Sequence, residues 1–409
     1  MTVESGENLL PLLSTRREYF DYLDRWAVGT VADLRAHMTG RALVKAFLLE
    51  TSRTNGARDT LAAFQAVDQE VSEVDDTLYR LRYPTEQGDW ALLEVENQRY
   101  PVLYTALESK AAARRVDRLM QTPLLDRAWF AAPLFNRLWQ MILDAFPPYR
   151  FSQIVFEHES RYEVSLEEQE LLALRRAEPE DSDEDEDEEE IGPPIERRRA
   201  RGQIAERIGR LNEVLPELKS NYNPLESIVR LRFPAVPRGG HDIHFDGRFT
   251  NRSDSMASLR STVAEVTKIY QRSTERAESI SWPSASAAKD LPQRISLGEP
   301  LFIKFSKELD LDTFERWMGA LRRKNNRFRL WGNQIKLGSG KVHIYGVDNH
   351  LWQPIDLEIT QRHLYALLSP GTCGNTIHRL VTNIQRYVDP KPDAFIGGKP
   401  YESFISPPS

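Results

Sequence analysis

The stretch "SPGTCGNTIHRLVTNIQRYVDP", residues 369–390, predicts a tight turn followed by an amphipathic helix. Gly371 and Gly374 permit the turn, and Thr372 or Asn375 can cap the first helical turn. Apolar residues recur at intervals of three and four, which places their side chains on one side of a helix. These residues are Ile377, Leu380, Val381, Ile384, Tyr387 and Val388.

The opposite side of this helix carries Arg379, Asn383 and Arg386, spaced at i, i+4 and i+7. Arginine side chains bind carboxylate or phosphate through their planar fork, so this side is a candidate anion-binding surface. The alternative is an ordinary solvent-exposed face.

Cys373 is the single cysteine of the 409 residues, which excludes an internal disulfide and any metal site that needs two thiolates. Its place at a helix N-terminus makes it a weak catalytic candidate, because the helix dipole lowers a thiol pKa. His378 is an unsuitable base, because a separation of five residues turns it about 140° away on a helix. The alternative is a small, partly buried turn residue.

Charge is distributed unevenly along the chain. The formal net charge is −7, but the run "EPEDSDEDEDEEE" at 178–190 carries eleven acidic residues, which leaves the rest of the chain at +4. Gly192-Pro193-Pro194 follows this run and stops any helix. A solvated acidic linker is therefore expected; a loop that competes for a basic patch elsewhere is the alternative.

Short turn-linked strands mixed with helices predict an α+β protein with mainly antiparallel sheet. A helical N-terminal region and two mixed strand and helix units, joined by the acidic linker, are expected. The predicted segments are a helical region 1–75, an α+β domain 76–176, a disordered linker 177–194, a helix-strand-strand-helix segment 195–285, a C-terminal α+β domain 295–395 that may also pack with 195–285, and a tail 396–409.

Apolar spacing predicts N-terminal helices over 14–38, 41–53 and 57–74, and a further helix over 203–220. Two segments, 93–104 ("LEVENQRYPVLY") and 357–365 ("LEITQRHLY"), share a Leu-Glu start, a central Gln-Arg and a final Leu-Tyr. Each precedes a predicted helix. A duplicated module and chance similarity both explain this likeness.

A metal site is one interpretation of "HDIHFDGRF". In a strand, Asp242, His244 and Asp246 share one face at period two, and two carboxylates with one imidazole can hold a divalent ion. The segment lacks an HExxH or EF-hand pattern. Polar alternation on a half-exposed strand, with Ile243 and Phe245 packed inward, is the alternative.

A basic and aromatic cluster in "LRRKNNRFRLWG" is typical of phosphate contact combined with base stacking. With the helix arginines, it gives a set of candidate nucleic-acid-binding residues in and beyond the basic region 322–341. They are Arg322, Arg323, Lys324, Arg327, Arg329, Trp331, Arg379 and Arg386. A basic helix end followed by a core strand is the alternative.

The sequence has no P-loop, GxGxxG or GxSxG pattern. It has no apolar run long enough for a membrane span, and "MTVESGENLLPLL" does not resemble a secretory signal. We therefore expect a cytosolic protein without a cofactor that acts as a non-catalytic, protein-binding accessory subunit. Nucleic-acid or other polyanion binding through residues 322–341 is the alternative, and a metal- or Cys-dependent hydrolase or nuclease is the second alternative.

Overall fold

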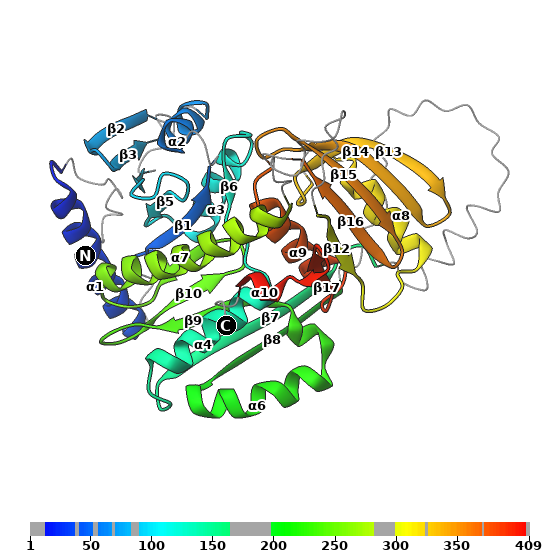
Figure 1. Ribbon diagram of the computed structural model, residues 1–409. Coiled ribbons are helices and arrows are strands. Elements are labelled where there is room, and N and C mark those ends of the chain that lie inside the picture. Colours follow the sequence, from blue (N-terminus) through cyan, green and yellow to red (C-terminus); the bar gives the residue numbers. More distant parts are fainter. Residues whose placement is uncertain are drawn as a thin grey trace, which may run out of the picture.

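The computed structural model describes residues 13–36, 41–51, 56–67, 70–82, 90–163, 198–281, 299–323, 326–369 and 372–405. Two antiparallel sheets of eleven and seven strands, with helices packed on them, form the molecule (Figure 1). The α+β prediction, with mainly antiparallel sheet in two units, is thus confirmed. In the described residues, no helix has both the length and the apolar character that a membrane crossing needs.

The eleven-stranded sheet has the order β2-β3-β4-β5-β1-β11-β10-β9-β7-β8, and β6 pairs with β1. Strands from before the acidic run and from residues 198–251 therefore share one sheet. The strands are β1 (Lys45–Glu50), β2 (Glu70–Asp75), β3 (Leu78–Arg82), β4 (Trp90–Glu94), β5 (Val102–Thr105), β6 (Asp126–Arg127), β7 (Phe151–Ser160), β8 (Arg198–Arg207), β9 (Ile228–Pro234), β10 (Gly240–His244) and β11 (Arg248–Asn251).

Helices cover this sheet unequally. On one side lie α1 (Arg16–Arg35), α4 (Ala132–Ala145) and α7 (Met256–Ser281), whose apolar side chains share a core with strands from both ends of the sheet. On the other side, α2 (Gly56–Gln65) and α3 (Ser109–Leu119) pack on β1 to β5. Among the described residues, the core under α2 and α3 includes none from β7 to β11.

The seven-stranded sheet has the order β13-β14-β15-β16-β12-β17-β18. One side packs against α8 (Leu311–Leu321) and α9 (Asn375–Tyr387), and the other exposes large side chains such as Trp331, Tyr345 and Leu367. The strands are β12 (Leu301–Lys304), β13 (Leu330–Gly338), β14 (Lys341–Asp348), β15 (Gln353–Thr360), β16 (His363–Leu368), β17 (Asp393–Ile396) and β18 (Lys399–Pro400). The remaining helices are α6 (Ile208–Asn221), the short 3-10 helix η1 (Asn223–Glu226) and α10 (Glu402–Ile405).

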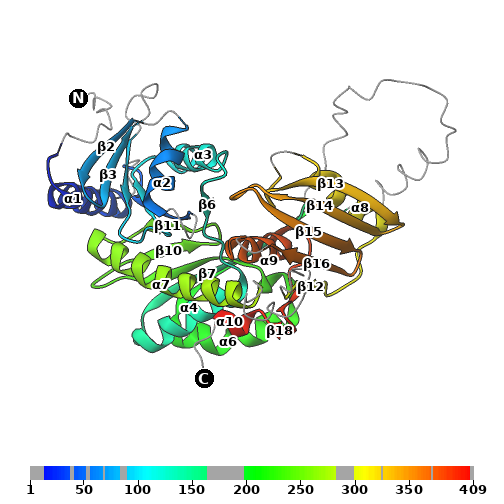
Figure 2. The same cartoon turned by 45° about the horizontal axis from the view of Figure 1, so that its top comes forward.

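The predicted helix of the opening stretch is α9, and it lies between the two sheets (Figures 1 and 2). All thirteen of its residues are buried, including the polar ones. The interpretation of Arg379, Asn383 and Arg386 as a solvent-exposed face was therefore wrong. The apolar stripe of α9 packs in the hydrophobic core, and its polar side contacts buried carboxylates and backbone carbonyl groups.

Some elements differ from the prediction. Within the predicted helix 41–53, residues 45–50 form the central strand β1 instead, because a short apolar run that is buried on both faces resembles a helix in its spacing. The predicted helix 57–74 divides into α2 and β2, and 203–220 divides into the end of β8 and α6. Part of the predicted tail is ordered, since Tyr401, Phe404 and Ile405 are buried. The acidic run 178–190 lies outside the described residues.

The two similar segments both form two adjacent antiparallel strands followed by a helix. The first contributes to β4 and β5 before α3, and the second to β15 and β16 before α9. The two segments thus share a strand-strand-helix arrangement, and duplication stays a hypothesis.

Candidate functional site: a basic cavity on the large sheet

The uncovered side of β9, β10 and β11 is polar because of strand alternation. Register partners place Lys45, Thr250, Asp242 and Arg232 in one row across β1, β11, β10 and β9. Opposite partners point to the same side of a sheet. Phe47, two residues after Lys45, faces the core under α2 and α3, so the polar row continues the side on which these helices lie.

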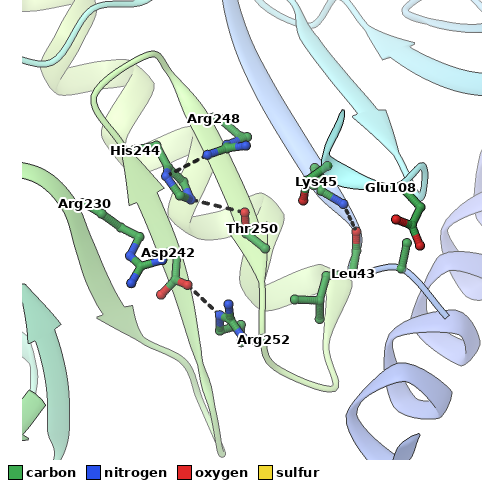
Figure 3. A pocket seen from close by; sticks show the side chains of 11 residues that line it. Leu43, Lys45, Glu108, Arg230, Asp242, His244, Arg248, Thr250 and Arg252 are labelled. Atoms are coloured by element: carbon green, nitrogen blue, oxygen red, sulfur yellow. Dashed lines mark hydrogen bonds and ion pairs between the residues drawn. The ribbon is translucent and has the colours of Figure 1, made fainter. Parts of the chain in front are cut away.

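A cavity of about 380 Å³ lies where this polar side meets the start of α3. In Figure 3, side chains from β9 to β11 lie on one side of it, and Lys45, Leu43 and Glu108 on the other. We call it the basic cavity. Its lining residues are Ala42, Leu43, Lys45, Glu108, Ser109, Arg230, Asp242, His244, Arg248, Thr250 and Arg252.

Asp242 is an internal counter-ion at the floor of the basic cavity. Its carboxylate accepts hydrogen bonds from Arg232 Nε at 2.7 Å and from Arg252 Nε at 2.5 Å. Burial opposes its ionisation, but the two guanidinium groups hold its pKa at about 2. Asp242 is therefore charged at neutral pH. The two arginines that it orients balance its negative charge, so it does not act on an incoming anion as an isolated carboxylate.

Lys45 is a buried cation in the wall of the basic cavity. Only 2% of the residue is exposed, and Nζ donates to the carbonyl oxygens of Leu43 at 2.9 Å and Leu107 at 2.7 Å. Burial, reinforced by the positive charge of Arg248, lowers its pKa to about 8. The side-chain amine therefore remains mostly protonated at neutral pH. Burial of this charge costs free energy of desolvation, which a bound anion would offset.

His244 is neutral and orients Arg248. Burial lowers its pKa to about 3, and the charge of Arg248 contributes to this shift. Arg248 Nη2 lies 3.0 Å from Nδ1, and Thr250 Oγ1 lies 3.3 Å from Nε2. Because a guanidinium can only donate, we assign the ring proton to Nε2, which donates to Thr250.

The arginines keep unused donors. Among the described residues, Nε of Arg230 and Nε of Arg248 are buried and have no hydrogen-bond partner. Burial lowers the pKa of Arg230, and neighbouring Arg232 and Arg252 add to this effect, although Asp242 opposes it. Positive charge is thus concentrated here beyond what the neighbouring carboxylates neutralise.

Four cationic side chains and two carboxylates line the basic cavity, and His244 adds no charge. The lining therefore has an excess of two positive charges at neutral pH. Guanidinium and ammonium groups around a cavity of this size can bind a phosphate or carboxylate group.

The structure does not support a metal at the predicted residues. Asp242 pairs with arginines, His244 is held by Arg248 and Thr250, and Asp246 Oδ2 lies 3.5 Å from Arg127 Nη1. Within the described ranges, no group of three or more His, Cys, Asp or Glu side chains is arranged to hold a metal ion. Asp242 and Asp246 instead form ion pairs with arginines.

Cys373 lies in a buried ion cluster before α9. Its thiol donates to Glu50 Oε1 at 2.8 Å, and Arg99 Nη2 lies 3.5 Å from the sulfur. Burial and the carboxylate of Glu50 raise the thiol pKa well above its ordinary value. A nucleophile needs the opposite shift and access to substrate. His378 instead contacts Thr274 and Tyr401.

The predicted nucleic-acid-binding residues fall into two groups. Arg322, Arg323, Arg327 and Trp331 are exposed, whereas Lys324 lies outside the described residues. Arg329, Arg379 and Arg386 are buried: the first two pair with Asp126, and Arg386 pairs with Glu157. These three buried arginines form ion pairs within the molecule, so the seven described residues do not form one surface.

Arg379 connects both sheets through α9. It forms an ion pair with Asp126 of β6, and its Nη2 lies 2.6 Å from Asp348 Oδ1 at the end of β14. Neighbouring His350 is 1% exposed, and both of its ring nitrogens lack a hydrogen-bond partner among the described residues. The ion pairs of Arg379 thus join an element of each sheet to α9.

A model of the MJECL33-like protein family matches residues 13–183 and 240–403. The chain belongs to the MJECL33-like protein family. Lys45, Glu108 and Arg248 lie within the matched segments, and Arg230 lies outside them.

One relative in this family is the uncharacterized protein MJECL33 of Methanocaldococcus jannaschii. It is 30% identical to the chain over 149 residues, which cover 36% of the chain and 34% of the relative. The match thus spans about a third of that relative's length. No solved structure matches the chain.

Most residues of the basic cavity were missed by sequence reasoning. The alternation in "IVRLRFP" was an available signal, because Arg230 and Arg232 sit at period two between buried residues. The contribution of Lys45 was not visible, because 41–53 was predicted to be helical. The approach of α3 to β10 and β11 is a tertiary arrangement without a local signal.

Proposed function

We propose that this protein binds nucleic acid, with phosphates held on the basic side of the eleven-stranded sheet. The observation that carries the proposal is the excess of two positive charges around the basic cavity. Contacts to phosphate supply most of the affinity for nucleic acids, and they need this kind of unneutralised arginine and lysine.

The basic residues extend beyond the cavity, as a polymeric ligand requires. Arg230 donates to Gln153 on β7 and to Gln203 on β8, which carry the polar side across two more strands. Arg199 and Arg201 of β8 are about half exposed and pair with Glu157. Neighbouring strands are about 4.8 Å apart, so the path from β10 to β8 is long enough for several phosphates.

The test is fluorescence anisotropy with a labelled single strand and a labelled duplex, measured over a range of salt concentrations. Binding should weaken steeply with salt, and Arg230→Gln should lower the salt slope by about one and the affinity by about fivefold. Arg272→Gln on the exposed side of α7 removes the same charge elsewhere and should change neither quantity by more than a small amount. Salt-independent binding, or no binding, contradicts the proposal.

The same assay compares the basic cavity with the predicted region 322–341. Arg322 and Arg323 are exposed, and Arg322 Nε donates to Gln334. If the cavity is the main site, the double variant Arg322→Gln/Arg323→Gln should bind nearly as tightly as the wild type. A greater loss in this double variant than in Arg230→Gln would assign binding to the C-terminal region.

A protein-binding accessory role is the second candidate, and the outer side of the seven-stranded sheet favours it. Tyr345 on β14 and Tyr365 and Leu367 on β16 are exposed on either side of β15, and Trp331 on the edge strand β13 is 57% exposed. Aromatic side chains are enriched at protein interfaces. Tagged protein purified from its own host should lose a stoichiometric partner in Tyr345→Ser/Tyr365→Ser, and an unchanged set of partners contradicts this role.

A further inference from the structure

We propose that the basic cavity binds a phosphomonoester, the terminal phosphate of a nucleic-acid strand or of a mononucleotide. The inference rests on the proposed function and names the group that the cavity recognises. Phosphodiesters of a bound strand would then lie further out, over β9, β7 and β8.

Charge favours a terminal phosphate over an internal one. The lining has an excess of two positive charges, with Asp242 ionised and His244 neutral. A phosphomonoester carries about −1.5 to −2 at neutral pH, whereas each internal phosphodiester carries one charge. The monoester therefore neutralises the cavity and the diester leaves a positive charge uncompensated.

The start of α3 adds donors that suit three terminal oxygens. Glu108 is the N-cap residue, its side chain makes no capping hydrogen bond, and the first turn has no acidic residue. The first N–H groups of a helix lack intrahelical partners and carry partial positive charge, so they bind phosphate oxygens. Glu108 and Ser109 both line the cavity, which directs this helix end toward the space beside Lys45.

The polar side chains of the cavity are fixed before a ligand arrives. Asp242 orients Arg252, His244 orients Arg248, and two carbonyl oxygens hold Lys45. Donors that are already oriented lose little freedom on binding, which favours one phosphate geometry over a range of them. The volume of about 380 Å³ lies at the lower end for ligand pockets and is suited to one nucleotide unit.

The experiment compares ligands that differ only in the terminal phosphate. Labelled short single strands of one sequence carry a 5′-phosphate, a 3′-phosphate or hydroxyl groups at both ends, and AMP and adenosine serve as competitors. We expect at least one phosphorylated ligand to bind about tenfold more tightly than its dephosphorylated counterpart. The arm that shows this preference identifies the source as a 5′ end, a 3′ end or a free nucleotide.

Ser109→Pro with Ser109→Ala as its control isolates the helix contribution. Proline is tolerated at the first helical position and removes one N–H donor. Glu108, with ψ 152°, lies outside the helical region that is unfavourable for a residue before proline. Ser109→Pro should reduce the preference for the terminal phosphate several-fold, whereas Ser109→Ala should keep it.

Lys45→Met is a second variant, and its folding is checked by its unfolding midpoint. It should abolish most of the preference for the terminal phosphate and leave binding of the hydroxyl-ended strand nearly unchanged. Equal binding of all phosphorylated and hydroxyl-ended ligands overturns the phosphomonoester proposal while nucleic-acid binding stands. If neither kind of strand binds, nucleic-acid binding fails; calorimetric titration with AMP, with adenosine as its control, then decides the proposal, since binding of AMP alone supports a nucleotide site and no binding overturns it.

Discussion

Arginines on α9 and arginines around the basic cavity have opposite surroundings. Arg379 is fully buried, and two carboxylates from different sheets neutralise it. Arg230 and Arg248 belong to a set of cations that outnumber the carboxylates beside them, and each keeps a buried Nε without a partner among the described residues. The balance of charge, rather than the presence of arginine, separates a structural position from a ligand-binding one.

The largest expected effect is on stability, at α9. Arg379→Ala should lower the free energy of unfolding by about 3–5 kcal/mol, because it leaves Asp126 and Asp348 buried without this partner. Chemical denaturation measures this loss. Arg248→Gln is the matched change at the basic cavity and should cost about 1 kcal/mol or less. Equal losses in the two variants would remove the distinction between the two regions.

The next largest expected effect is the pH dependence of the free energy of unfolding that His350 causes beside Arg379. Burial lowers its pKa from 6.5 to about 4, although Asp126 and Asp348 oppose the shift. A depressed pKa contributes stability above pH 6.5 that is lost as the pH falls through 4, and the full shift corresponds to about 3 kcal/mol. The stability of His350→Leu should fall less than that of the wild type over this range. Parallel curves would contradict a neutral buried imidazole.

The smallest expected effect is on affinity, at the rim of the basic cavity. Glu108 is exposed and carries one of the two negative charges of the lining. Glu108→Gln should tighten binding of a phosphorylated strand about threefold and leave the unfolding midpoint unchanged, as expected for an exposed charge. Anisotropy titration at low ionic strength measures the change. Weaker binding in this variant would mean that the carboxylate itself contacts the ligand.

The sequence predicted local features of both regions and missed what brings them together. The spacing from Ile377 to Val388 specified α9 closely, because one apolar stripe was enough. Burial of its polar side depends on Asp126, 253 residues away along the chain. The strands β9 and β10 agree with the two strands predicted within 195–285, whereas β1 was not predicted, since four consecutive apolar residues at 46–49, buried on both faces, carry no strand-specific alternation.

The one thiol of the chain gives the protein an internal reporter. Cys373 is 3% exposed and lies where the start of α9 meets Glu50 of β1. A thiol reagent can reach this sulfur only when that contact opens. The rate of labelling therefore measures how often the contact between the start of α9 and β1 opens, without an added probe or a substitution.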